Sequence, residues 1–338
     1  RGLFSDGDVT LGMCRLAIFD PANGSTFGPY SPTTCDGTQY QLRKQKDFST
    51  EWRLIGDAGA INWQVGAYYL HIDRTVGVSL GGDTGAGVIK NLYNAPNTAN
   101  PTSLLLADNF DTKVYAAFGS LDYKPNDQFK AGLAMRYDIE DRASNSLVPT
   151  ATDPFTGGPI NPGQAFGPLT PKSASFKQLQ PKITLSYTPT SELNIYANWG
   201  IGFKSGGFNL DPTAANLINS TAVLTTGAAP IYADPRFDSE KVDAYEIGAK
   251  ATFGRINANI ALFQMDMSDF QVLEFTGVQF TTFNVAGARS RGFEVEVFGR
   301  LHDYISVNAS VTHAKAHFFH ICNLPLNKVV AIAPRPQP

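Results

Sequence analysis

Apolar and polar residues alternate along several segments of the chain. In the clearest case, apolar residues occupy the odd positions from Phe129 to Ile139, while polar or small residues, Arg136 among them, occupy the even positions. A period of two residues is that of a β-strand, whose side chains point alternately to the two faces of a sheet. The same alternation recurs in segments 61–69, 179–187, 193–201, 245–253, 293–297 and 305–311, and less regularly in 256–267. The pattern predicts an all-β, antiparallel fold of about ten strands.

The connections between these segments are of two kinds that follow one another in turn. Tight turns are expected at 57–59, 124–126, 188–190, 254 and 299–302. The other connections, 73–110, 141–173, 204–239 and 268–286, are far longer than the roughly 2 to 6 residues usual in compact domains. Short turns at one rim and long loops at the other are typical of a transmembrane β-barrel.

The length of the alternating segments supports a membrane protein over a sandwich with one solvated face, which would alternate in the same way. Runs of roughly 10 to 13 residues, tilted by about 40°, would span some 25 to 30 Å, the height of an outer-membrane apolar band. Aromatic residues near strand ends on the apolar face would form its interfacial girdle. These are Tyr123, Tyr137, Tyr187, Trp199, Tyr245 and Phe253. The polar face would then line a wet lumen.

Composition narrows the possibilities further. The 338 residues are 43% hydrophobic and 17% charged, which is enough apolar material for a folded chain. A net charge of -3 provides no basic stripe, so we expect no nucleic-acid partner. No run of 18 apolar residues could form a membrane helix. Because Arg1 opens neither a signal peptide nor an initiator methionine, we expect that the natural N-terminus lies upstream.

Four segments resemble one protein family in their residues and their order. They are STEWRLIGDAGAINWQVGAYYLHID at 49–73, YANWGIGFKSGGFN at 196–209, YEIGAKATF at 245–253 followed by ALFQMDMSDFQV at 261–272, and NVAGARSRGFEVEV at 284–297. Residues 47–315 are similar to the barrel of TonB-dependent outer-membrane receptors. The matching motif positions are Gly202, Phe203, Lys204, Gly206, Gly207, Phe208, Asn209, Asn284, Gly287, Arg289, Gly292 and Glu294.

The resemblance implies a barrel of about 22 strands in the outer membrane of a Gram-negative bacterium, closed around a plug domain. Such receptors import a scarce nutrient, such as an iron–siderophore complex, cobalamin or a glycan. The TonB energy-coupling complex drives import through the plug. The implied partners are therefore outer-membrane lipid, that complex and a small-molecule ligand such as a metal chelate. The resemblance implies no cofactor and no enzymatic activity.

This sequence departs from the family pattern in several respects. We count about ten strands, no plug, no energy-coupling box before a plug and no final strand that ends in an aromatic residue. Ten strands leave two unpaired edges, so the expected structure is an open, curved sheet. We expect an extracellular loop region at 1–46, a partial barrel at 47–315 and an irregular tail at 316–338, which is truncated, frame-altered or a poorly ordered extension.

Cysteine and histidine residues give weaker signals. Cys14 and Cys35 would close a loop of about 20 residues, a size at which a disulfide stabilises by about 3 kcal/mol in the entropic model, and we expect them to be bonded. His313, His317 and His320 are spaced as metal ligands could be, but they lie at a strand end where solvated side chains are the simpler interpretation. We therefore assign no metal site.

Candidate ligand-binding residues are the cations on the predicted lumen face, namely Arg136, Lys182, Lys204 and Lys250. They could equally balance neighbouring carboxylates. Asp266 and Asp269 could be proposed as a catalytic carboxylate pair. Neither a positioned partner nor a nucleophile accompanies them, so we assign no catalytic residue. A passive porin and a soluble β-sandwich or adhesion module remain as alternatives to a receptor. The substrate cannot be read from one chain, since external loops vary.

Overall fold

The computed structural model describes residues 2–5, 36–82, 91–98, 100–154, 157–161, 169, 171–210, 235–275 and 280–319. Ten long strands form one antiparallel sheet in which each strand pairs with the next along the chain. They are β2 Asp36–Ala58, β3 Ile61–Gly82, β4 Thr102–Tyr123, β5 Phe129–Ser146, β6 Lys172–Thr190, β7 Leu193–Lys204, β10 Glu240–Phe253, β11 Ile256–Phe275, β12 Phe280–His302 and β13 Ile305–Phe318. The predicted all-β fold of about ten strands is confirmed.

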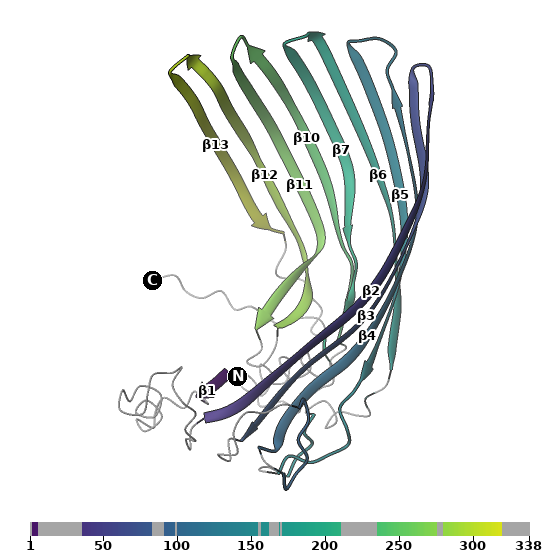
Figure 1. Ribbon diagram of the computed structural model, residues 1–338, viewed down its shortest axis with the longest axis vertical. Coiled ribbons are helices and arrows are strands. Elements are labelled where there is room, and N and C mark those ends of the chain that lie inside the picture. The colour runs from purple at the N-terminus through teal and green to yellow at the C-terminus, as the bar shows by residue number, and fades with distance from the viewer. Residues whose placement is uncertain are drawn as a thin grey trace.

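Three short strands complete the described structure. β1 Gly2–Ser5 pairs with the start of β2, and β8 Gly207–Phe208 pairs with β9 Arg236–Phe237 as a separate ribbon. The large sheet curves strongly about a concave face, and its edge strands β1 and β13 do not pair with each other (Figure 1). The predicted open, curved sheet is therefore confirmed. Within the described ranges, no helix is long and apolar enough to cross a membrane.

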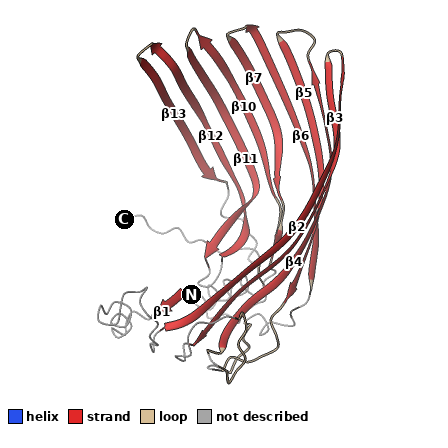
Figure 2. Cartoon of the chain, in the orientation of Figure 1, coloured by secondary structure: helices blue, strands red, loops and turns tan. Residues whose placement is uncertain are grey.

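The five tight turns all lie at one end of the sheet, which we call the turn rim (Figure 2). They connect β2 to β3, β4 to β5, β6 to β7, β10 to β11 and β12 to β13, in the predicted order. The turns expected at 188–190 and 299–302 lie further along the chain, at 191–192 and 303–304, because β6 and β12 continue through the expected positions. Gly59 and Gly254 have φ angles of 62° and 61°, a left-handed conformation that a residue with a Cβ adopts only at a cost. The longer connections lie at the opposite end, which we call the loop rim.

The strands reach further towards the loop rim than the sequence predicts. β2 begins at Asp36, before the boundary expected at 46/47, and residues 2–5 also form a strand. β3 continues to Gly82, and β11 and β12 leave only residues 276–279 between them, in place of the long loop expected at 268–286. Cys14, Cys35, Cys322, His320 and most of the 316–338 tail lie outside the described residues.

The outer, convex face is apolar and exposed in the half of the sheet near the turn rim. Leu185 and Ile247 are each 53% exposed, and Trp52 is 75% exposed. The apolar positions predicted for 129–139 lie on this face, and Phe129 stacks on Tyr187 near the turn rim with ring centroids 4.5 Å apart. A continuous exposed apolar surface of this kind is what hydrocarbon, rather than water, would cover.

Near the loop rim, by contrast, both faces of the sheet are covered. On the outer face of β4, Leu105 and Ala107 are buried against Ile160 from the β5–β6 connection. On the inner face, Leu106 and Phe110 are buried against Leu210, which follows β8. The only buried hydrophobic clusters of the described chain lie here, which places this part of the sheet beyond the lipid-facing band.

Candidate ligand-binding face

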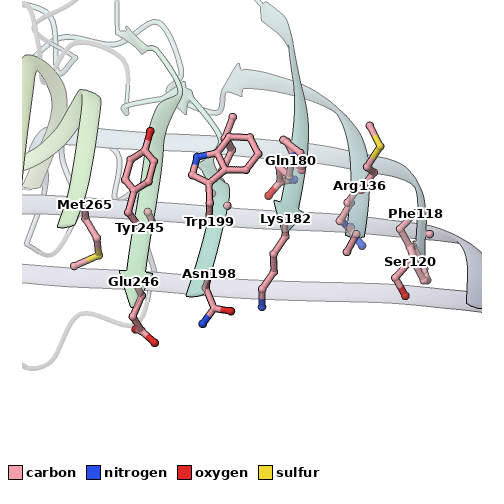
Figure 3. Close-up of a pocket in the computed structure, with 18 of the residues that line it drawn as sticks. Phe118, Ser120, Arg136, Gln180, Lys182, Asn198, Trp199, Tyr245, Glu246 and Met265 are labelled. Atoms are coloured by element: carbon pink, nitrogen blue, oxygen red, sulfur yellow. The ribbon is translucent and has the colours of Figure 1, made fainter. Parts of the chain in front are cut away.

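A hollow of about 820 Å³ lies on the concave face in the middle of the sheet. Lys182, Asn198 and Glu246 project to the same side of the sheet, while Trp199 and Tyr245 project to the opposite side (Figure 3). The hollow's charged side chains come from five strands. They are the carboxylates Glu51, Glu246 and Glu294 and the cations Arg53, Arg136 and Lys182. The charges that line the hollow therefore balance, at three of each sign.

Arg136 is held firmly in this hollow. Its Nη2 and Nε donate to the carboxylate of Asp138 at 2.7 and 2.8 Å, and Nε2 of Gln180 donates to the same carboxylate at 2.6 Å. The guanidinium also lies 5.2 Å from the ring centroid of Tyr68 and 5.9 Å from that of Phe118. A bidentate ion pair and cation–π contacts fix its position, and part of its charge is already neutralised.

Two of the three lysines predicted for this face, Lys182 and Lys250, differ in their surroundings. Lys182 lines the hollow and forms no ion pair with any residue that the structure describes. Lys250 lies nearer the turn rim, with its Nζ 5.7 Å from the ring centroid of Tyr196. Lys182 is therefore the more available of the two to a ligand in the hollow.

A second hollow of about 640 Å³ lies closer to the loop rim, and we call it the vestibule. Arg43, Arg74, Arg142 and Lys204 all contribute to its lining, and no described carboxylate does so. Arg142 donates to Glu140 at 2.8 Å, but its Nε is buried without a hydrogen-bond partner among the described residues. A buried donor of this kind is costly unless a further group accepts from it.

The cations that line the vestibule affect the pKa of Arg74. Arg74 lies on the loop side of the apolar band, where its guanidinium stands 5.1 Å from the ring centroid of Phe110. Burial lowers the pKa of Arg74, and the charges of Arg142 and Arg43 lower it further. Like charges held together in a partly buried hollow favour the binding of an anion.

Residues 205–210, the described start of the connection between β7 and β10, lie on the concave face and form one wall of the vestibule. Leu210 and Phe208 pack on Val76 and Phe110 of β3 and β4. Asn209 fixes the connection to β12, since Nδ2 donates to the Thr282 carbonyl at 2.7 Å and the Thr282 N–H donates to Oδ1 at 2.7 Å.

Asn284 and Gln271 hold the other end of this connection. Nδ2 of Asn284 donates to the Asp238 carbonyl at 2.9 Å, and its Oδ1 accepts from the Asp238 N–H at 2.7 Å. The Gln271 N–H donates to Glu240 at 2.8 Å, and its side chain donates to the Ser205 carbonyl at 2.9 Å. The motif positions Asn209 and Asn284 therefore position the wall of the vestibule.

Several other motif residues either pack closely against a neighbouring segment or line one of the two hollows. A Cβ at Gly206 would meet the ring of Phe176 and, at 2.5 Å, the carbonyl of Phe237, so the chain passes too closely there for a side chain. Gly287 and Gly292 face the backbones of Met267 and His313 in the same way. Lys204 and Glu294 line the vestibule and the central hollow respectively.

The four predicted cations do not all lie in one hollow. Arg136 and Lys182 share the central hollow, Lys204 lies in the vestibule, and Lys250 lies in neither. Arg43, Arg74 and Arg142 were not predicted, because β2, β3 and β5 extend further towards the loop rim than the alternating segments do. The signal was present in 136–142, where the alternation of inward side chains continues through Asp138 and Glu140 to Arg142.

Possible metal ligands are not grouped. No cluster of three or more His, Cys, Asp or Glu residues with metal-binding geometry occurs in the described part of the chain. His313 and His317 lie on the outer face of β13, opposite Phe293 and Arg289 of β12. Asp266 accepts a hydrogen bond from Arg289 and is thus part of an ion pair.

A curved antiparallel sheet with a lipid-compatible outer face and a polar inner face defines the wall of a transmembrane β-barrel. The TonB dependent receptor-like, beta-barrel family model matches residues 12–328. The chain belongs to this family, whose members are receptors of the Gram-negative outer membrane.

Solved structures share the fold at low sequence identity. The ferric yersiniabactin uptake receptor FyuA from Yersinia pestis is 17% identical with a TM-score of 0.59, and the match covers 84% of this chain and 37% of that one. The copper transporter OprC is 13% identical with a TM-score of 0.56, and the match covers 85% of this chain and 40% of that one. The siderophore receptor PiuA from Acinetobacter baumannii is 16% identical with a TM-score of 0.52, and the match covers 82% of this chain and 39% of that one. The chain thus spans about two fifths of the length of these proteins.

Proposed function

We propose that this chain forms the ligand-binding wall of an outer-membrane receptor for the energised uptake of an anionic metal chelate, such as an iron–siderophore complex. The cationic vestibule carries the proposal. It combines Arg43, Arg74, Arg142 and Lys204 at the extracellular end of the concave face, and its lining contains no described carboxylate. A ligand with several carboxylate or catecholate oxygens would satisfy the buried Nε of Arg142 and reduce the repulsion among these cations.

A path for such a ligand continues below the vestibule. The central hollow lies next along the concave face, and there Lys182 is available while Arg136 is held by Asp138. A near-neutral hollow beneath a cationic one would bind an anion less tightly, which favours release inward. Energised uptake also requires a plug domain and the TonB complex, as it does in other members of the family.

The proposed ligand class can be tested with outer-membrane vesicles that contain the chain. Vesicles are titrated with radiolabelled ferric citrate as the anionic probe and with cobalamin, which lacks clustered carboxylates. We expect the double substitution R74Q/R142Q to weaken ferric citrate binding by about tenfold or more, since two charge-assisted contacts are lost. Lys177→Gln, which removes an exposed cation on the outer face of β6, should leave binding unchanged. Equal binding by R74Q/R142Q and the unsubstituted chain would refute the proposal.

Energised import is tested separately in cells that produce the whole receptor. A proton uncoupler should stop accumulation of the bound chelate while leaving binding at the cell surface intact. Uptake that continues in the presence of the uncoupler, and that rises linearly with chelate concentration, would instead identify a passive porin.

A further inference from the structure

The outer face of β11, β12 and β13 becomes polar closer to the turn rim than that of β5. On β5 six outward positions, from Phe129 to Ile139, are apolar or Ala. On β11 only four such positions precede Gln264, namely Ile256, Ala258, Ile260 and Leu262. Strand pairing places Arg291 of β12 and Lys315 of β13 beside Gln264. We call Gln264, Arg291 and Lys315 the polar row.

Arg291 and Lys315 form an unusual pair. They are directly opposed across β12 and β13, both are exposed, and neither has an ion-pair partner among the described residues. Like charges directly opposed on one face of a sheet destabilise it. The nearest outward carboxylate, Asp266, is already bound to Arg289 and to Nε2 of Gln264, the latter at 2.9 Å. Among the residues that the structure describes, the pair therefore has no counter-ion.

The surroundings of this pair define what could neutralise it. Below the polar row, towards the turn rim, Leu262, Phe293 and Val311 are exposed by 52%, 37% and 60% on the same outer face, where His313 lies opposite Phe293. Hydrocarbon chains of the bilayer cover this surface, so a soluble anion would reach it poorly. An amphiphile with an anionic head and acyl chains would match both parts at once, with its head at the cations and its chains along the apolar side chains.

We propose that Arg291 and Lys315 form a binding site for the phosphate group of a phosphorylated lipid in the outer leaflet of the membrane. The Arg291 guanidinium can donate two parallel hydrogen bonds to phosphate oxygens, and the Lys315 ammonium adds a point charge beside it. Arg289 and its partner Asp266 lie one row closer to the loop rim, where the guanidinium stands 4.9 Å from the ring centroid of Phe319. That ion pair closes the site on its extracellular side.

The site can be tested by native mass spectrometry of the whole chain in mild detergent, titrated with bisphosphorylated lipid A. We expect R291Q/K315Q to bind this lipid at least about tenfold more weakly than the unsubstituted chain, because two charge-assisted contacts are lost. Lipid A without its phosphates should bind the unsubstituted chain about as weakly. Lys177→Gln serves as the matched control, since it removes another exposed outer-face cation.

Arg291→Lys provides a check against a folding defect, because it keeps the charge while losing the bidentate geometry; it should bind with intermediate affinity. Equal lipid binding by R291Q/K315Q and the unsubstituted chain would overturn the proposal. Equal loss in Lys177→Gln would also overturn it, since only general surface charge would then matter. Displacement of the lipid by millimolar inorganic phosphate would assign the site to a free anion instead.

Discussion

Asn209 and Thr282 are joined by two reciprocal hydrogen bonds of 2.7 Å, in which the Asn209 side chain pairs with the β12 backbone as a neighbouring strand would. Nδ2 of Asn209 donates in addition to the Pro235 carbonyl at 3.1 Å. Asn209 is nearly buried, with 8% of its surface exposed. One side chain thus anchors the connection that walls the vestibule.

Asn209→Ala should therefore release this connection. It leaves the N–H and C=O of Thr282 without their partners, which we expect to lower the free energy of unfolding by about 1–3 kcal/mol. Limited proteolysis should cut between β7 and β10 several times faster than in the unsubstituted chain. Asn257→Ala is the control, because Asn257 makes a single exposed contact with Thr252, and its effect should stay within about 0.5 kcal/mol. Unchanged proteolysis of the Asn209 variant would disprove the anchoring role.

Two glycines on the concave face should respond differently to one added methyl group. A Cβ at Gly66 would meet the Phe118 ring and lie 2.6 Å from the backbone oxygen of Trp52, which cannot move aside. Gly66→Ala should cost about 1–3 kcal/mol in urea unfolding measured in detergent. At Gly202 the nearest atom, Cβ of Val242, is 3.9 Å away, so Gly202→Ala should be neutral or slightly stabilising. Similar losses at both positions would contradict this packing.

Adjacent residues on β6 provide a test of which face meets lipid. Ile183 lies on the outer face at mid-height of the apolar band, and Thr184 lies on the inner face. Ile183→Arg should reduce the free energy of unfolding in lipid vesicles by about 2–4 kcal/mol, the usual penalty for Arg at the bilayer midplane of a barrel. Thr184→Arg should have a much smaller effect, since its charge would face water. The reverse order would mean that the two faces are assigned the wrong way round.

The ion pair between Arg136 and Asp138 should show strong coupling. Asp138 is almost fully buried, with 5% of its side chain exposed, whereas Arg136 is 35% exposed. Arg136→Ala leaves the carboxylate with Gln180 as its remaining side-chain donor, and we expect a loss of about 1–3 kcal/mol. The double substitution R136A/D138N should recover part of that loss, as a double-mutant cycle would measure. Additive effects would indicate that the pair contributes no interaction energy.

The sequence predicts the lipid-facing half of the sheet well, because each strand there separates hydrocarbon from a polar lumen. That contrast produces the alternation from Phe129 to Ile139. The five turns can be predicted because they interrupt this alternation. Near the loop rim the alternation is lost although the strands continue. Leu104, Leu105 and Leu106 are consecutive apolar residues of β4, and Leu105 and Leu106 are buried by connections on opposite faces. A strand covered on both sides has no period of two to detect.

The candidate site was predictable only in part for the same reason. Lys182 and Arg136 lie within alternating segments, so their common face follows from the pattern. Arg74 and Arg142 lie beyond those segments, on strands separated by β4, and only the register of β3, β4 and β5 brings them to one hollow. Long-range register depends on the fold of the loops as well as the strands.

The shorter apolar stretch on β11, β12 and β13 has a consequence for the way this protein sits in the membrane. β11 has two apolar outward positions fewer than β5, which corresponds to about 13 Å along a strand, or roughly 10 Å of bilayer height after tilt. A bilayer meets such a mismatch by thinning locally or by letting the protein lean. We therefore expect the bilayer to be thinner beside β11, β12 and β13 than beside β5.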